Sequence, residues 1–206
     1  MDSKDLAATY DRIAEDWNRD HQNDDWWVEG TDHFISKLPE GAHVLDIGAG
    51  AGVKAKYLST RGLRVTGMDI SKNLLEIARE RAPDAEFVLY SMYDLDTLPG
   101  TYDAAFAQAS LLHIPKNDAS GIVVAMAEKI VAGGLVYLAV KEVQEGKPEE
   151  GMLVENDYGY EYERFFSYFT MDELQGYMEA AGLAIIWQNR KDTGKTVWLQ
   201  IIGRKS

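Results

Sequence analysis

The sequence contains no cysteine among its 206 residues, which excludes disulfide bonds, thiolate nucleophiles and cysteine-based zinc sites. Histidine is scarce as well. The four histidines (His21, His33, His43 and His113) lie far apart without an i, i+4 pair, so we expect no metal site. The chain also lacks a run of about 18 apolar residues and begins without a basic and apolar leader. We therefore expect neither a membrane-spanning helix nor a signal peptide, and these absences favour a cytoplasmic protein.

Positively charged residues are fewer than negatively charged ones. The chain has 21 Lys and Arg against 34 Asp and Glu, a formal net charge of -13. Surfaces that bind nucleic acids or anionic membranes usually carry a basic face, so we expect neither as a partner. Apolar residues make up 46% and charged residues 27%, the balance of a globular protein of one domain. A small-molecule partner is the better expectation.

Apolar segments of strand length alternate with amphipathic helical segments, and no internal repeat is visible. This alternation predicts an α/β fold with a mainly parallel sheet. The last two strands must be antiparallel, because only the short turn 192–195 joins them. Residues 142–169 show no clear period, whereas Thr170 and Glu173 form a capping box. The expected strands are 42–47, 64–69, 86–91, 102–108, 135–141, 184–189 and 197–202, and the expected helices are 6–17, 31–38, 53–60, 71–81, 117–131 and 170–181.

Residues 44–52, VLDIGAGAG, begin as a buried strand and end as a glycine-rich turn. Such a turn lets a ligand approach the backbone, and the following helix directs free N–H groups at it. The dinucleotide fingerprint G-x-G-x-x-G fails, because Val53 occupies its third glycine position. Asp46, two residues before Gly48, disfavours a pyrophosphate and favours an ammonium or sulfonium group. Asp69 ends the next strand, where a carboxylate can accept from ribose hydroxyls, so the pattern favours S-adenosylmethionine (SAM) over NAD.

Five motifs in order resemble those of the class I, Rossmann-like SAM-dependent methyltransferases, most closely the small bacterial group related to ubiquinone and menaquinone methyltransferases. VLDIGAGAG is similar to motif I, VTGMDIS to motif II and YDAAFAQASLLHIPKND to the strand-4 motif, and IVAGGLVYLAVKE and FTMDELQGYMEAAGL are similar to the two later motifs. The resemblance covers roughly residues 10–203. It implies a three-layer sandwich around a seven-stranded, mostly parallel sheet of order 3-2-1-4-5-7-6, with strand 7 antiparallel.

The resemblance assigns residues to the methionine part of SAM. It places Gly48 and Gly50 beneath that part, with Asp46 near its amino group and the backbone of Gln108 beside it. Tyr10, on the first helix, covers the cofactor in this interpretation. The alternatives are that Asp46 caps nearby loops and that Tyr10 packs in an ordinary apolar stripe.

The adenosine part follows in the same way. The resemblance implies that Asp69 holds the ribose, with loop capping as its alternative role, and that Ile70 packs on the adenine. The family usually has an aspartate after strand 3 that accepts from the adenine N6 amine, whereas this chain has Ser91. Either Ser91 or Asp94 is the acceptor, and the backbone of Met92 is a further contact.

Methyl transfer from SAM leaves S-adenosylhomocysteine (SAH) as the product. The reaction is an in-line displacement that depends mainly on alignment, and it needs a base only when the acceptor arrives protonated. His113 follows the strand 102–108 at the ligand-binding edge and is the candidate base. The alternative is a structural histidine whose ring bonds to loop backbone.

Candidate substrate residues lie in two segments. The candidates for a substrate pocket are Trp17, Trp26 and Trp27, with packing inside a lid as the alternative. Arg164 is a candidate for binding an anionic group or for a salt bridge to a nearby glutamate, and Tyr168 follows it in the aromatic run ERFFSYF. The segment 142–169 that holds this run is the expected substrate cap.

We expect one methyltransferase domain over residues 1–206. It comprises a helical lid (1–38), a cofactor-binding core (39–141), the substrate cap (142–169) and a C-terminal helix with the antiparallel strand pair (170–206).

The sequence favours methyl transfer to an O, N, S or C atom of a small molecule, by a monomer or homodimer. Residues 108–111, QASL, differ from the Asn/Asp-Pro-Pro-Tyr motif of methylases that act on adenine N6 or on glutamine amides. The alternatives are a SAM-binding module without catalysis and, less favoured, an NAD(P) oxidoreductase.

Overall fold

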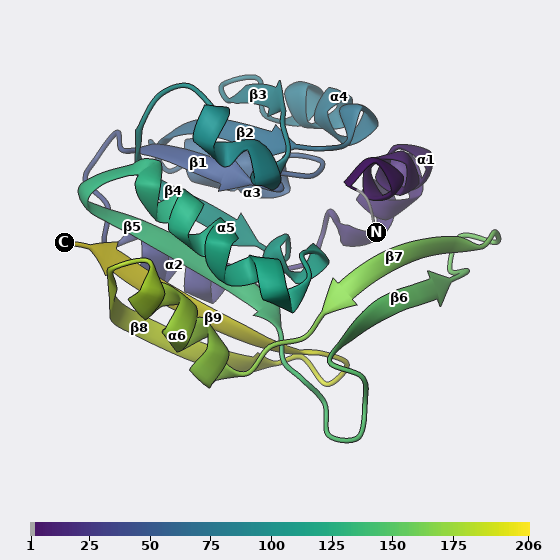
Figure 1. Ribbon diagram of the computed structural model, residues 1–206. Helices are drawn as coiled ribbons and strands as arrows, with labels where there is room; N and C mark the ends of the chain where they lie inside the picture. Colours follow the sequence, from purple (N-terminus) through teal and green to yellow (C-terminus); the bar gives the residue numbers. More distant parts are fainter. Residues whose placement is uncertain (1–2) are drawn as a thin grey trace.

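A computed structural model describes residues 3–206, which surround a seven-stranded sheet (Figure 1). The strand order is β3-β2-β1-β4-β5-β9-β8, and β9 runs antiparallel to both of its neighbours. When the separate hairpin β6-β7 is left out, this is the predicted order, so the predicted fold class is confirmed. The strands are β1 His43–Ile47, β2 Arg64–Asp69, β3 Glu86–Leu89, β4 Tyr102–Gln108, β5 Ile130–Lys141, β6 Glu150–Glu155, β7 Tyr162–Ser167, β8 Leu183–Asp192 and β9 Val197–Lys205.

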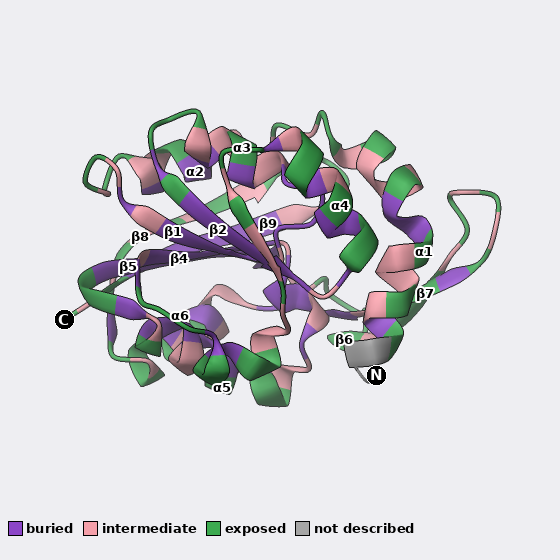
Figure 2. Ribbon diagram, turned by 90° about the horizontal axis from the view of Figure 1, so that it is seen from above, coloured by how far each residue is buried: buried purple, intermediate pink, exposed green. Residues whose placement is uncertain are grey.

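Helices cover both faces of the sheet (Figure 2). On one face α5 and α6 pack through Val123 and Leu174. On the other, α2 and α3 pack through Phe34 and Leu58. The first helix lies outside these layers, against α4 and the hairpin strand β7. The helices are α1 Ser3–His21, α2 Val28–Ile35, α3 Val53–Ser59, α4 Lys72–Arg81, α5 Lys116–Glu128 and α6 Met171–Ala180, with short 3-10 helices η1 Met92–Thr97 and η2 Leu111–His113.

The central strands are apolar on both faces because helices cover both sides of a parallel sheet. Strand β1 is buried from Val44 to Ile47 and β4 is buried at six of its seven residues. Their carboxyl ends lie next to each other in the sheet, since Asp46 pairs with Gly67 on β2 and with Phe106 on β4. Polar side chains at these ends therefore converge at one edge.

Strand β5 begins at Ile130, five residues before the predicted start, and α5 ends at Glu128. The predicted helix end at Val131 was wrong, because Val131 and the three residues after it belong to the strand. Gly133 has φ +77°, and a Cβ on Gly134 would lie 2.7 Å from the backbone oxygen of Asp103. The two glycines therefore let β5 bend against β4, where the register shifts.

The hairpin β6-β7 lies within the segment that showed no period. Most β6 side chains are exposed on both faces of the two-stranded sheet, so they lack the alternation that marks a half-buried strand. Strand β3 also ends earlier than predicted, at Leu89, and the Ser91 side chain then caps η1. The hairpin and the early end of β3 both follow the carboxyl end of a strand of the main sheet.

Within residues 3–206, no helix has both the length and the apolar character needed to cross a bilayer. The same residues contain no group of three or more His, Asp or Glu side chains placed to hold a metal ion.

Candidate functional site

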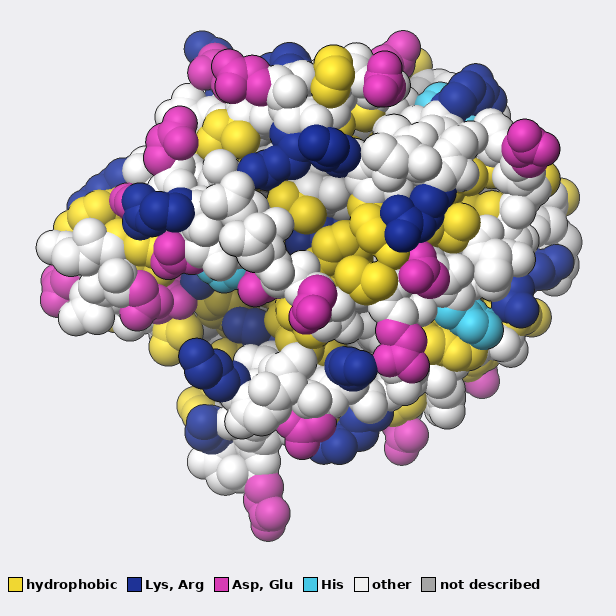
Figure 3. All heavy atoms as spheres, turned by 180° about the vertical axis from the view of Figure 1, so that it is seen from behind, with side chains coloured by type: hydrophobic (Ala, Val, Ile, Leu, Met, Phe, Trp, Pro, Cys, Tyr) yellow, Lys and Arg dark blue, Asp and Glu magenta, His cyan; other side chains and the backbone are white. Residues whose placement is uncertain are grey.

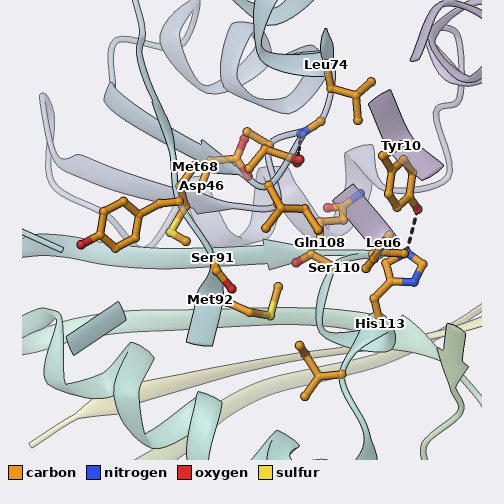
Figure 4. Close-up of a pocket in the computed structure, with 18 of the residues that line it drawn as sticks. Leu6, Tyr10, Asp46, Met68, Leu74, Ser91, Met92, Gln108, Ser110 and His113 are labelled. Carbon is orange, nitrogen blue, oxygen red and sulfur yellow. Dashed lines mark hydrogen bonds between the residues drawn. The ribbon is translucent and has the colours of Figure 1, made fainter. Parts of the chain in front are cut away.

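A cavity lies at the carboxyl ends of β1, β2 and β4, beneath α1 (Figure 4). It encloses about 1100 Å³ when its open mouth is included, which is large enough for a nucleoside-sized ligand. Apart from Asp94, the alternative to Ser91, every residue that the sequence assigned to the cofactor lines this cavity: Tyr10, Asp46, Gly48, Gly50, Asp69, Ile70, Ser91, Met92 and Gln108.

The glycine-rich turn forms the floor of the cavity. Its backbone turns sharply, with φ values of +77° at Gly48 and +53° at Gly50, a region that glycine adopts without steric cost. A Cβ on Gly48 would lie 2.3 Å from the Cβ of Ser110, and one on Gly50 would lie 3.3 Å from the Trp17 ring. The floor is bare because neighbouring side chains already occupy the space that a side chain would need.

Asp69 is held rigidly at the end of β2. One carboxylate oxygen accepts from the Gly50 N–H at 2.8 Å, and the other accepts from the Ser71 N–H at 2.9 Å. Burial raises the pKa of Asp69, and these backbone hydrogen bonds oppose the rise. Each oxygen keeps acceptor capacity for a further donor in the cavity.

Asp46 is buried at the end of β1 with an incomplete set of partners. Burial raises its pKa to about 7, while the positive charge of Lys54 opposes the rise. Its Oδ2 atom has no hydrogen-bond partner within the described chain, and the same holds for Nε2 of Gln108. Thr31 donates to the other amide atom of Gln108 at 3.4 Å. Two buried polar atoms beside the glycine turn are thus available to a ligand.

The opposite end of the cavity is mainly apolar. Ile70, Leu74 and Met92 line it, while Ser91 accepts a hydrogen bond from the Tyr93 N–H at 3.2 Å. Asp94, the alternative to Ser91, does not line the cavity. It lies instead in a shallow hollow outside, which Ile70 and Ser91 also border.

Tyr10 and His113 close the cavity from the side of α1 (Figure 4). The Tyr10 hydroxyl is 2.7 Å from His113 Nε2, and His113 Nδ1 is 2.7 Å from the backbone oxygen of Phe165. Burial lowers the pKa of His113 to about 3, so the ring is neutral at pH 7. Because a carbonyl only accepts, Nδ1 carries the proton, and Nε2 accepts from Tyr10.

The predicted substrate residues divide into two groups. Trp17 lines the cavity, whereas Trp27, Arg164 and Tyr168 lie outside its lining. Trp27 is only 3% exposed and packs edge-on against Tyr57. The prediction that this ring lines the pocket therefore fails on geometry, because α2 turns it into the protein.

Arg164 forms a salt bridge with a glutamate, the second of the two roles considered for it from the sequence. Its guanidinium binds both carboxylate oxygens of Glu155, at 2.7 and 2.6 Å, across the hairpin. It also donates to the Tyr10 hydroxyl at 3.2 Å, so it fixes the ring that closes the cavity. Tyr168 instead stacks beside Phe166, with ring centroids 6.4 Å apart.

Several lining residues were not predicted from the sequence. Leu6 and Leu74 lie in the apolar stripes of two amphipathic helices, a pattern that by itself indicates only packing against the core. Ser110 donates to the backbone oxygen of Ile47 at 2.6 Å and so joins β1 to the loop after β4. Lys54 and Phe165 reach the cavity from α3 and β7. The only sequence signal for Lys54 is its position directly after the glycine turn.

Comparison with known families and sequences shows that the chain is similar to methyltransferases. Residues 44–134 match the family described as "Methyltransferase domain". The ubiquinone biosynthesis O-methyltransferase of Methylocella silvestris is 31% identical over 165 residues, covering 68% of this chain and 63% of that protein. The enzyme of the same name from Dechloromonas aromatica is 32% identical over 54% of this chain and 49% of its own length. The chain thus spans about half to two thirds of these relatives.

Solved structures share the fold at low identity. The Burkholderia thailandensis 1,6-didemethyltoxoflavin-N1-methyltransferase, with bound 1,6-didemethyltoxoflavin and S-adenosylhomocysteine, has a TM-score of 0.78 at 19% identity, covering 99% of this chain and 88% of that one. The magnesium protoporphyrin IX methyltransferase of Synechocystis PCC 6803, with bound SAH, has a TM-score of 0.78 at 18% identity and covers 100% of both chains.

Proposed function

We infer that the chain belongs to the class I, Rossmann-like methyltransferase family, and we propose that it binds SAM and transfers the methyl group to a small-molecule acceptor. The observation that carries the proposal is the buried Asp46 carboxylate, whose Oδ2 lacks a partner beside the glycine turn. A buried carboxylate without a partner is costly, and a ligand ammonium group removes that cost. Among the described residues Nε2 of Gln108 also has no partner, and it can donate a hydrogen bond to an acceptor atom of the ligand.

The other cavity residues fit the rest of the cofactor. Asp69 keeps acceptor capacity for ribose hydroxyls while Gly50 and Ser71 hold it in place. Ile70, Leu74 and Met92 provide an apolar slot for the adenine. Ser91, rather than Asp94, borders this slot, and its oxygen accepts one hydrogen bond already.

When bound, SAM supplies a methyl group on a sulfonium centre that is attacked in line. The chain aligns the reactants and excludes water, which gives the main rate gain for such a reaction. Tyr10, fixed by His113 and Arg164, closes the cavity on the side of α1. His113 stays the candidate base, and it can take a proton from an acceptor only after Tyr10 releases Nε2.

The proposal extends to the surroundings of the enzyme. We propose that residues 1–38 act as the lid and 142–169 as the substrate cap, and that the protein works in the cytoplasm as a monomer or homodimer. An acidic chain of net charge -13 supports a small molecule rather than a nucleic acid or a membrane as its partner.

Calorimetric titration with SAH, with NAD in parallel, tests the proposal. We expect SAH alone to bind, and Asp69→Asn to weaken binding by at least about tenfold, because the loss of charge weakens acceptance from the ribose. Asp94→Asn, a change on an exposed side chain outside the cavity, is the matched control and should bind as the unchanged protein does. Binding of NAD alone would overturn the proposal. Binding of SAH without methylation of amines, phenols or thiols would favour a module without catalysis.

A further inference from the structure

Lys141 lies at the carboxyl end of β5, one strand away from the cavity. Its partner across the antiparallel pair with β9 is Trp198, and Ala139, two residues before it, pairs with Gln108 on β4. Because side chains alternate along a strand, Lys141 projects from the same sheet face as Ala139 and Gln108. The Lys141 side chain therefore lies on the face that carries Gln108 in the cofactor cavity, just beyond the end of that strand.

Aromatic rings surround the Lys141 ammonium group. Its Nζ atom is 4.2 Å from the centroid of the Phe166 ring and 6.0 Å from that of Trp198. Trp198 in turn stacks on Trp26, with centroids 3.8 Å apart and planes 11° apart. Phe166 also contacts His113, at a centroid distance of 4.9 Å. One ring thus separates Lys141 from the pair that closes the cavity.

No carboxylate neutralises this lysine. Among residues 3–206, no Asp or Glu oxygen forms a salt bridge with Lys141, and Glu155 is engaged by Arg164 through both of its oxygens. Burial lowers the pKa of Lys141 to about 8; the neighbouring charge of Arg164 adds to this effect and the charge of Glu155 opposes it. A cation kept largely buried without an anion is unfavourable, and here it occurs in a chain with an excess of 13 negative charges.

The side chain remains accessible from solvent, because Lys141 is only partly buried. The rear view of the molecule shows a hollow on the side of the hairpin, in which Lys or Arg side chains lie among hydrophobic ones (Figure 3). A cation among aromatic rings suits a ligand that carries a negative group on an apolar frame. The single positive charge of Lys141 suits a ligand that carries a single negative charge.

We propose that Lys141 binds the carboxylate of an aromatic methyl acceptor, whose ring packs against the partly exposed side chain of Trp26. This inference rests on the proposed methyltransferase function and names the substrate class of that site. The carboxylate anchors the acceptor at the end of β5, and the ring extends toward Tyr10 and His113, where the methyl group is delivered. Lys141 is in this arrangement a specificity residue that contacts the substrate away from the reacting atoms.

Matched acids and amides test the inference on SAH-saturated protein. We would measure by NMR titration at pH 6.5 the dissociation constants of benzoate and 2-naphthoate, each against its primary amide. We expect each acid to bind about tenfold or more tightly than its amide, as a charge-assisted hydrogen bond implies. Lys141→Met should abolish that preference, and Lys141→Arg should keep it because it keeps the charge. Lys147→Met, on an exposed loop residue, is the control and should behave as the unchanged protein does.

The outcomes separate this inference from the proposed function. Equal binding of acids and amides, or an acid preference that survives in Lys141→Met, overturns the role of Lys141. If SAH binds normally in that case, the cofactor proposal stands and only the substrate class fails. If the unchanged protein does not bind SAH, the proposed function fails and this inference fails with it. SAH affinity measured in Lys141→Met also reports whether the variant is folded.

Discussion

At the scale of single residues, Gly48 combines two demands that only glycine meets. Its φ is +77°, and a Cβ would lie 2.3 Å from the Ser110 Cβ. We expect Gly48→Ala to lower the free energy of unfolding by about 2–5 kcal/mol, the sum of backbone strain and overpacking. Denaturant titration monitored by circular dichroism measures this change.

Gly62→Ala is the matched control for that substitution. Gly62 has φ +83°, but no atom lies within 4 Å of the position that a Cβ would occupy. The substitution should therefore lower the free energy of unfolding only through backbone strain, by about 1–2 kcal/mol. Equal losses in the two variants would show that the close approach to Ser110 has no effect on stability.

His113 allows a test of its role as a base. Burial lowers its pKa to about 3, so its protonation does not change above about pH 5. For an acceptor found in a panel of phenols, amines and thiols, we expect His113→Ala to reduce turnover by about 100-fold or more at every pH from 6 to 9.

Tyr10→Phe serves as the comparison for His113→Ala. It removes the hydroxyl that occupies Nε2 but leaves the imidazole in place, so a base at His113 should keep most of its activity. Unchanged turnover in His113→Ala across this pH range would reject the base role and leave the histidine as a support for the Phe165 backbone.

At the scale of elements, α1 is held over the cavity by a small set of polar contacts with α4. Asp11 accepts from the Ser71 hydroxyl at 2.6 Å and from the Asn73 N–H at 3.0 Å. We expect Asp11→Ala to speed dissociation of SAH several-fold and to raise hydrogen exchange in α1, because the helix loses charge-assisted hydrogen bonds. Stopped-flow displacement and exchange mass spectrometry measure the two effects.

Glu15→Ala provides the control on the same helix. Glu15 is exposed and has no side-chain hydrogen bond within the described residues, so its removal should change neither rate. If Asp11→Ala releases SAH at the rate of Glu15→Ala, the contact with α4 does not retain the ligand.

At the scale of the whole molecule, the buried Asp46 links stability to pH. Its pKa is raised from 3.8 to about 7 by burial, so the folded state binds this proton more tightly than the unfolded state. The contribution of Asp46 to stability is therefore largest below pH 4 and is lost as the pH rises to about 7. We expect the unfolding free energy of the ligand-free protein, relative to Asp46→Asn, to fall over this interval.

Binding of SAH should reverse that trend, because the ligand ammonium group favours the charged carboxylate. The shift in melting temperature on adding SAH should increase from pH 5.5 to pH 8, and Asp46→Asn should remove the increase. Thermal unfolding at the two pH values measures this, and an equal shift at both would show that Asp46 stays ionised throughout or is remote from the ligand.

The sequence alone determined the order of the core elements and several of the residues that meet in the cavity. Strands β2 and β4 have their predicted bounds, because buried parallel strands read as continuous apolar runs. Asp46, Gly48 and Asp69 were identified because strand, turn and carboxylate follow one another locally. Local order in the chain is sufficient when a motif lies on consecutive residues.

Only the tertiary structure decided how distant segments complete the site. In the folded chain the Trp27 ring is buried. Arg164 binds Glu155 and Tyr10. The rings of Phe166 and Trp198 lie next to the Lys141 ammonium group. Except for the pair Arg164–Glu155, these contacts join residues far apart in the sequence. The hairpin takes part in most of them, and its sequence has no period that would predict it. The cofactor end depends on short-range backbone geometry, whereas the substrate end depends on which side chains the fold brings together.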